Sequence, residues 1–157
     1  MILALYHGSG KKIEKPEFGV GNPANDYGLG FYCTQERNLA CEWGVAEYRN
    51  GFANRYEFET EGLEIIDLNT PRYCTLHWLA VLVGNREFDL KYPQQRLAAE
   101  YLAKNFSVDV DKADVIVGYR FGIFKTGKFI AVEFQEFQVG KRHFVSFISA
   151  NTVAQRA

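Results

Sequence analysis

The sequence predicts a single α+β domain, because strand-like segments run along the whole chain while helical segments fall mostly in its first two-thirds. A chain of 157 residues fits one domain and is long enough to bury a hydrophobic core. Apolar residues make up 47% of the chain and aromatic residues 15%, which is typical of sheets with filled interiors and argues against disorder. No internal repeat or low-complexity linker divides the chain.

The N-terminal part is predicted to contain two short strands, over residues 2–6 and 28–33, joined by a polar loop over residues 10–25. Loops of this length in compact domains are usually functional. Thr34 as N-cap and Gly51 as C-terminal glycine then bound a helix predicted over about residues 35–49. Four apolar residues follow at helical spacing, namely Leu39, Ala40, Trp43 and Ala46, and of these Trp43 is expected to lie in the core.

The middle of the chain alternates between strand and helix. Residues 52–60 alternate in polarity, as a half-buried strand does, and a turn at Glu61-Gly62 leads to a short strand over residues 63–68. Residues 75–83 are predicted to form a short apolar helix and residues 94–105 an amphipathic one. The last part is predicted to be mostly strand, over residues 115–117, 129–137 and 143–148.

Charge and cysteine usage narrow the classes of protein to consider. The formal net charge is −1, so the whole chain has no electrostatic attraction to nucleic acid or to an anionic membrane. The three cysteines and three histidines show no paired metal-ligand spacing, which argues against a zinc site and favours reduced thiols. No apolar run has the length of a membrane span or a signal peptide, so we expect a cytoplasmic protein.

Two motifs carry the functional prediction. The first strand delivers His7-Gly8-Ser9, and about twenty residues later Gly28-Leu29-Gly30-Phe31-Tyr32 enters the second strand. A histidine, a glycine that permits close approach and an exposed tyrosine are the groups that hold a flat, polar aromatic ring. Either motif alone is more often structural, with turn glycines and a buried tyrosine. The two motifs in this order and spacing are more specific.

These motifs resemble the ADP-ribosyltransferase superfamily, in the branch that uses His, Tyr and an acidic residue or Gln. More closely, the chain resembles the bacterial domain of unknown function 3990 family, which is grouped with those transferases. The matching residues follow one another in sequence order, namely residues 5–9, 26–34, Ala40, Trp43, Asn54, Tyr56, residues 78–79, Asn85, Arg86 and residues 114–118. The resemblance is clearest over residues 3–119, and residues 120–157 diverge from it.

The resemblance implies a split β-sandwich with flanking helices over residues 1–157, with NAD as co-substrate. In such a protein the His7 ring contacts a ribose hydroxyl, and Gly8 holds the nicotinamide amide through its backbone. Tyr32 stacks on the nicotinamide ring, and Ser9 hydrogen-bonds the adenosine side. Tyr27 is either the second wall of the ring pocket or an aromatic residue packed on the sheet.

The resemblance also implies an acidic third residue on a late strand, beside an aromatic side chain, and here the sequence leaves alternatives. Glu136, followed by Phe137, fits that pattern and is our choice. Glu133 lies on the same predicted strand but on its opposite face, if the strand is regular. A rival alignment places His143 at this position, and the acid could also be absent.

The implied function is an NAD-dependent ADP-ribosyltransferase that cleaves the nicotinamide–ribose bond, with the role of a bacterial toxin or effector. Its target is expected to be a protein rather than a nucleic acid, given the net charge, and an antitoxin is a candidate partner. Because the sequence departs from the family pattern after Gly118, one alternative is a non-catalytic module that binds NAD or ADP-ribose. A structural or interaction protein is another.

Overall fold

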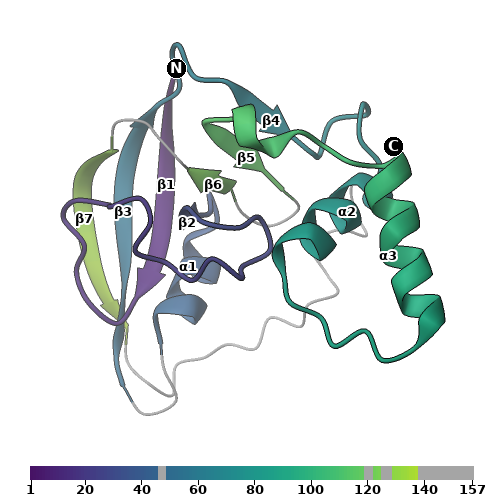
Figure 1. Cartoon of the computed structure of the whole chain (residues 1–157). Coiled ribbons are helices and arrows are strands. Elements are labelled where there is room, and N and C mark those ends of the chain that lie inside the picture. Colours follow the sequence, from purple (N-terminus) through teal and green to yellow (C-terminus); the bar gives the residue numbers. More distant parts are fainter. Residues whose placement is uncertain (46–48, 119–121, 125–128, 138–157) are drawn as a thin grey trace, which may run out of the picture.

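In the computed structural model, the described residues form a single-domain α+β fold of two sheets and three helices (Figure 1). The structure describes residues 1–45, 49–118, 122–124 and 129–137. The first sheet has the order β1-β3-β7 and is antiparallel throughout. Its strands are β1 (Ile2–Ser9), β3 (Gly51–Glu59) and β7 (Phe129–Phe137).

The second sheet has the order β2-β6-β5-β4, and only its β4–β5 pair is parallel. Its strands are β2 (Phe31–Cys33), β6 (Gly122–Phe124), β5 (Val115–Val117) and β4 (Ile65–Asp67). The sheets meet where Tyr6 and Thr34 exchange backbone hydrogen bonds, with N···O distances of 2.7 and 2.9 Å. This bridge brings the end of β1 beside the end of β2, which is where the two sequence motifs lie.

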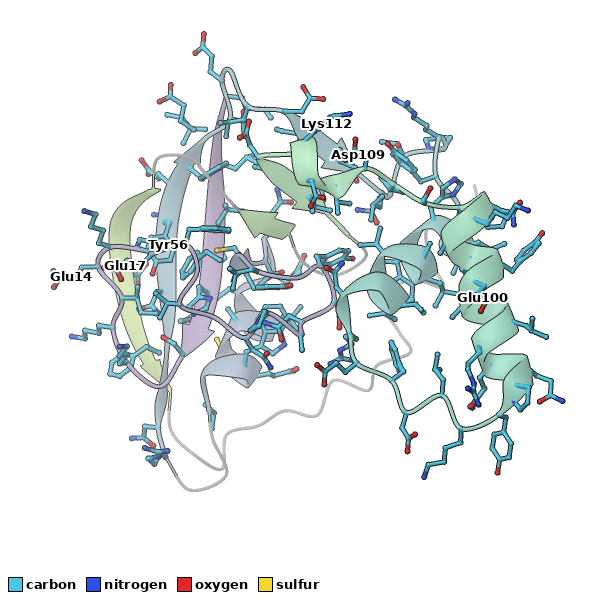
Figure 2. All side chains as sticks on the ribbon, in the orientation of Figure 1. Glu14, Glu17, Tyr56, Glu100, Asp109 and Lys112 are labelled. Carbon is cyan, nitrogen blue, oxygen red and sulfur yellow. The ribbon has the colours of Figure 1, made fainter. Side chains whose placement is uncertain are left out.

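The hydrophobic core has two parts, because the second sheet buries both of its faces. On β5, Val115 belongs to one cluster and Ile116 to the other, as expected for the alternation of side chains along a strand. The cluster between the sheets contains Leu5, Phe31, Cys33, Tyr56, Phe58 and Val115. The cluster on the outer face of the second sheet contains Tyr27, Leu68, Val81, Ala113 and Ile116. Figure 2 shows the fully buried Tyr56 among the strands of the first sheet.

The helices lie outside the sheets. Helix α1 (Arg37–Gly44) packs on β1 and β3, while α2 (Thr75–Asn85) contributes Val81 to the second cluster. Helix α3 (Pro93–Asn105) packs against α2, and a short 3₁₀ helix, η1 (Val110–Lys112), leads into β5. No described helix is both long and apolar enough to cross a membrane.

Glycines allow α1 to pack directly on the backbone of the first sheet. A Cβ atom on Gly8 would overlap the carbonyl oxygen of Ala40 and lie 2.6 Å from the amide nitrogen of Gly44. A Cβ atom on Gly51 would likewise overlap the carbonyl of Gly44. Gly8 is therefore needed for this helix–strand contact.

Most elements predicted from the sequence are confirmed. The strand predicted over residues 52–60 is β3, and the helices predicted over residues 75–83 and 94–105 are α2 and α3. The strands over residues 115–117 and 129–137 are β5 and β7, whereas residues 143–148 lie outside the described part of the chain. Strand β1 is longer than predicted and continues through Ser9.

The strand predicted over residues 28–33 begins only at Phe31 as β2, and that predicted over residues 63–68 is the shorter β4. Gly28 has a φ of 77°, in the left-handed region, so its backbone forms a turn and cannot extend β2. Helix α3 is present as predicted. In the structure as described, each of its residues is exposed or half-buried, and none is fully buried.

The predicted limits of the first helix are wrong. The helix begins after Glu36, and Thr34 instead accepts a hydrogen bond at its Oγ1 from the Glu36 N–H, at 3.0 Å. It ends at Gly44, followed by Val45 in extended conformation, because Gly51 already belongs to β3 and packs against the Gly44 carbonyl. The prediction that Trp43 lies in the core is also wrong, since 38% of it is exposed.

Gly8→Ala is expected to destabilise the protein by about 1–3 kcal/mol, because the added methyl group must push α1 away from β1. Gly10→Ala is the matched control, since a Cβ atom there meets no atom within 4 Å. Urea denaturation of the two variants measures the difference. Equal free energies of unfolding for both variants would contradict the packing described here.

Candidate functional site

His7 and Tyr32, the central residues of the two motifs, are joined by a hydrogen bond between β1 and β2. The Nδ1 atom of His7 lies 2.7 Å from the carbonyl oxygen of Tyr32. Because a carbonyl oxygen can only accept, Nδ1 must carry the proton. In the neutral ring this leaves the lone pair on Nε2, which can then accept a hydrogen bond from a hydroxyl group.

The surroundings of His7 keep its ring uncharged. The imidazole stacks on Phe31, with ring centroids 4.3 Å apart and an interplanar angle of 28°. Burial lowers the pKa of His7 from its ordinary value, and the hydrogen bond to Tyr32 opposes this effect only in part. At neutral pH the site therefore holds a neutral imidazole of fixed tautomer.

The buried amide of Asn54 fixes the end of β1 and the loop that follows it. Its Nδ2 atom donates to the carbonyl oxygen of His7 at 3.1 Å and to the Oγ of Ser9 at 2.9 Å. Its Oδ1 atom accepts from the backbone N–H of Ile13 at 3.0 Å, and the Tyr56 hydroxyl donates to the Ile13 carbonyl at 2.6 Å. Asn54 is thus a positioning residue that braces the loop.

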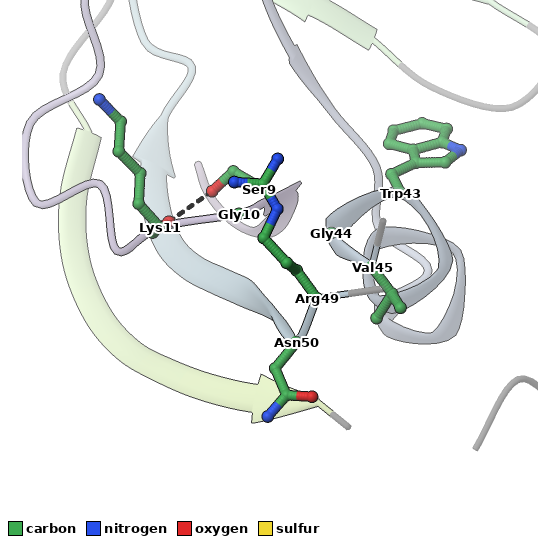
Figure 3. Close-up of a pocket in the computed structure, with 8 residues that line it drawn as sticks. All are labelled: Ser9, Gly10, Lys11, Trp43, Gly44, Val45, Arg49 and Asn50. Carbon is green, nitrogen blue, oxygen red and sulfur yellow. Dashed lines mark hydrogen bonds between the residues drawn. The ribbon is translucent and has the colours of Figure 1, made fainter. Parts of the chain in front are cut away.

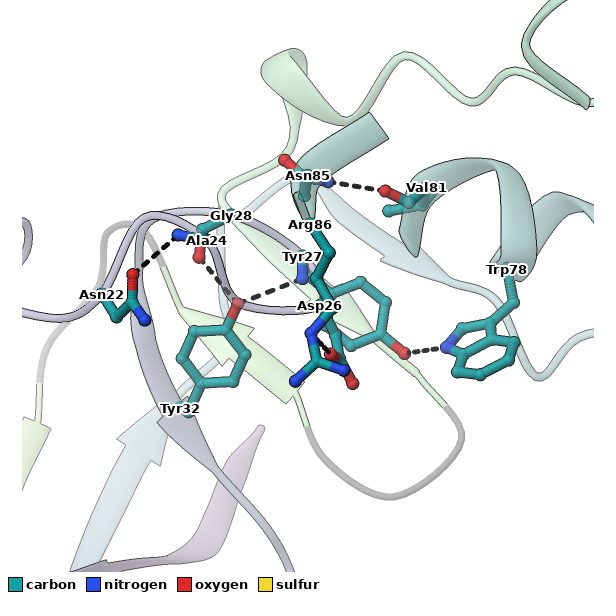
Figure 4. A network of polar contacts seen from close by, with 10 residues as sticks. All are labelled: Asn22, Ala24, Asp26, Tyr27, Gly28, Tyr32, Trp78, Val81, Asn85 and Arg86. Carbon is teal, nitrogen blue, oxygen red and sulfur yellow. Dashed lines mark hydrogen bonds and ion pairs between the residues drawn. The ribbon is translucent and has the colours of Figure 1, made fainter. Parts of the chain in front are cut away.

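The hydroxyl group of Tyr32 is already bound within the protein (Figure 4). It donates to the carbonyl oxygen of Gly28 at 2.7 Å and accepts from the N–H of Tyr27 at 3.1 Å. Burial raises the pKa of Tyr32 to about 12, so the phenol stays protonated. The hydroxyl therefore anchors the turn, and the half-buried ring is the part of Tyr32 that could contact a ligand.

Tyr27 lies in the core cluster on the outer face of the second sheet, with 3% of its surface exposed. Its hydroxyl accepts from the Nε1–H of Trp78 at 2.8 Å (Figure 4), and a Cβ atom on Gly118 would overlap it. Next to it, Asp26 forms an ion pair of 2.9 Å with Arg86, after the end of α2. The sequence left two roles open for Tyr27, a wall of the ring pocket or an aromatic residue packed on the sheet. Its buried position corresponds to the second role.

Gly8 lies in β1 and pairs with Ala53. The backbone of helix α1 occupies the space that a side chain at this position would fill. The close approach that this glycine permits is therefore made by the helix backbone. Ser9, at the end of β1, accepts from Asn54 and donates to the carbonyl oxygen of Lys11 at 2.5 Å.

Strand β7 brings two of the candidate acidic residues next to β3. Glu136 pairs with Phe52, which pairs in turn with Ser9, so these three residues form one row across the first sheet. This row lies two residues along β1 from His7. Residues two apart on a strand share a face, so position 136 belongs to the same face of the sheet as His7.

Glu133 occupies a different row of the sheet. It pairs with Arg55, the neighbour of Asn54, and its side chain is exposed. Because adjacent rows belong to opposite faces, Glu133 and His7 do not share a face. His143 lies outside the described residues.

A pocket of about 480 Å³ opens beyond Ser9, where β1, the end of α1 and the start of β3 meet (Figure 3). Its lining residues are Ser9, Gly10, Lys11, Trp43, Gly44, Val45, Arg49 and Asn50. Among them, Ser9 was predicted as a site residue from its motif, whereas Lys11 and Arg49 were not predicted. These two come from separate segments, and no local motif marks either of them.

A family model described as "Protein of unknown function (DUF3990)" matches residues 3–151. The chain therefore belongs to this family, and the closer of the two predicted resemblances is confirmed. The match continues through residues 120–151, where the sequence diverged from the expected pattern. No significant match was found among curated proteins or among solved structures.

The pKa of His7 predicts that the protein becomes less stable in mild acid. The unfolded chain protonates this histidine near its ordinary pKa of 6.5, whereas the folded chain does so only at lower pH. The unfolded state therefore binds more protons as the pH falls through 6.5, and the free energy of unfolding decreases. Below the folded-state pKa, this contribution falls no further.

Denaturation with urea at about pH 7.5 and about pH 5.5 measures this contribution. In His7→Asn, the amide can replace the donor to the Tyr32 carbonyl, but the side chain does not titrate. The stability difference between the two pH values is expected to be larger in the wild type than in this variant. The same difference in both proteins would show that His7 does not titrate as described.

Proposed function

We propose that this member of the DUF3990 family is an NAD-dependent ADP-ribosyltransferase. The observation that carries the proposal is the hydrogen bond between His7 Nδ1 and the Tyr32 carbonyl. It joins the histidine and tyrosine motifs at one place and directs the lone pair of a neutral imidazole to Nε2. Two sheets with a core between them and helices outside are also the architecture expected of such a transferase.

In the proposed reaction, His7 Nε2 accepts a hydrogen bond from a hydroxyl of the nicotinamide ribose, and the ring of Tyr32 packs on the nicotinamide. The bond between the ribose C1′ atom and the nicotinamide nitrogen breaks, and its electron pair leaves with the nicotinamide. Positive charge develops on the ribose, as it does in glycoside cleavage. A nucleophilic group of the acceptor then bonds to C1′ and gives up its proton.

Glu136 is the residue we assign to the developing positive charge. A carboxylate close to the ribose stabilises the charged transition state more than the neutral ground state of the sugar, which is what lowers the barrier. The assignment is supported by the row that Glu136 shares with Ser9 and Phe52, on the face of the sheet that carries His7. The proposal also includes a protein as the acceptor of ADP-ribose, and an antitoxin that binds the chain and blocks the site.

The second candidate function is a non-catalytic module that binds NAD or ADP-ribose. The burial of Tyr27 favours it, because a ring pocket without Tyr27 as its second wall holds nicotinamide less firmly. Turnover of NAD separates the two functions, since a binding module releases no nicotinamide.

Nicotinamide release from NAD by the purified full chain tests the enzymatic proposal. His7→Asn and Glu136→Gln are each expected to lower the rate on the order of 100-fold, because each removes a polar group that contacts the ribose or its charge. Glu133→Gln is the matched control and is expected to keep wild-type activity, since Glu133 lies on the other face of the sheet.

The variants also separate the alternatives for the third residue. Loss of activity in Glu133→Gln but not in Glu136→Gln would move the acidic role to Glu133. Saturable NAD binding without nicotinamide release, in the presence of candidate acceptor proteins, would favour the binding module. Absence of NAD binding to the wild-type chain would refute both functions.

A further inference from the structure

Away from the His7 site, the start of helix α2 holds a thiol beside an imidazole. Cys74 is the N-cap residue of α2 and is exposed, and its Sγ atom lies 3.3 Å from Nδ1 of the half-buried His77. The backbone N–H of Cys74 donates to the same Nδ1 atom at 3.0 Å. Because an N–H can only donate, Nδ1 holds a lone pair, and the thiol can direct its proton only toward it. A nucleophile is thus placed beside a base.

Two aromatic rings hold the imidazole in this orientation. His77 packs edge-on against Tyr73 and against Phe106, with ring centroids 5.5 and 5.3 Å apart. Phe106 ends helix α3, which packs against α2 (Figure 1). The base is therefore fixed by two helices, and not by its own helix alone. A cysteine whose neighbouring base is itself oriented by other groups is the arrangement found at activated thiols.

Positive charge lies on the same surface. The guanidinium group of the exposed Arg72 lies 5.6 Å over the ring of Tyr73, the residue that packs against His77. The N-terminus of α2 adds the positive end of the dipole of an 11-residue helix. Both stabilise the negative charge that develops on the Cys74 sulfur as its proton leaves, and both attract an anionic reactant.

The other two cysteines lie in different surroundings. Cys33 is buried between the sheets and Cys41 is half-buried on α1, and burial raises the pKa of both thiols. The Cys41 thiol also donates to the carbonyl oxygen of Arg37 at 2.9 Å. A reagent in solution should therefore react first with Cys74.

We propose that Cys74 and His77 form a thiol-modification site whose reactant is a small anionic disulfide. The thiol gives its proton to His77 Nδ1, and the Cys74 sulfur attacks one sulfur of the disulfide. The S–S bond of the reactant breaks, and a new S–S bond joins Cys74 to one half of it. The other half leaves with the electron pair and takes up the proton, so Cys74 is oxidised and the leaving half is reduced. This inference does not depend on the proposed function, because no NAD enters the step.

Reaction of the full chain with dithiobis(nitrobenzoate), an anionic aromatic disulfide, tests the site, because each exchange releases one coloured thiolate. We expect one of the three thiols to react in a fast phase, which Cys74→Ser removes and the control variant Cys41→Ser leaves unchanged. In His77→Gln, the amide oxygen can still accept from the Cys74 N–H but cannot take the thiol proton. This variant is expected to slow the fast phase about tenfold.

A second comparison tests the preference for an anion. Arg72→Gln is expected to slow the reaction with dithiobis(nitrobenzoate) but not with cystamine, a disulfide whose two ends are cationic. Lys91→Gln is the matched control, because this lysine pairs with Asp89 and is not among the residues that contact His77. Equal slowing of both reagents by Arg72→Gln would overturn the preference for an anionic reactant.

Exposure of Cys74 alone would give a different pattern of rates. A fast phase with the same rate in the wild type and in His77→Gln would overturn the inference, because the thiol is exposed in both proteins. A fast phase that persists in Cys74→Ser would overturn it as well, since the reacting thiol would then be another cysteine. Circular dichroism spectra of the variants confirm that their helices are retained.

Discussion

The buried side-chain amide of Asn54 is the interaction on which the candidate site depends. It bonds the His7 carbonyl, the Ser9 hydroxyl and the Ile13 N–H, so one residue of β3 fixes both the end of β1 and the loop behind it. A buried amide left without these partners would cost about 1–3 kcal/mol for each unsatisfied group. This cost opposes any rearrangement that separates the loop from β1. The position of His7 is consequently set by the sheet on both sides, by β2 through its ring and by β3 through its backbone.

A second constraint, the glycine contact between α1 and the first sheet, determines where the pocket lies. Gly8 and Gly51 let the helix backbone touch the strands, and the helix ends at Gly44. The chain then leaves the helix in extended conformation instead of continuing the turn. Trp43 consequently lies at the end of α1 beside the pocket, where Arg49 returns before β3. The same contact that stabilises the fold therefore assembles the pocket from three separate segments.

Local patterns predicted the strands and helices well but not the contacts between distant segments. Alternating polarity predicted β3, in which residues 54–58 alternate between buried and half-buried positions, and the order of the two motifs anticipated that His7 and Tyr32 lie together. The end of α1 at Gly44 could not be predicted, because it is imposed by β3 and not by the helix sequence. For the same reason the burial of Tyr27, which depends on Trp78 fifty-one residues away, left no local signal.

The central claim is that a neutral His7, protonated at Nδ1, offers Nε2 to the ribose of NAD. Long-range ¹H–¹⁵N spectra of the histidine rings test it most directly, with His7→Asn used to assign the signals of His7 among the three histidines. At neutral pH we expect the Nδ1–H tautomer of the neutral ring, and addition of NAD is expected to shift Nε2 more than Nδ1. A ring protonated at Nε2, or His7 signals unchanged at saturating NAD, would contradict the claim.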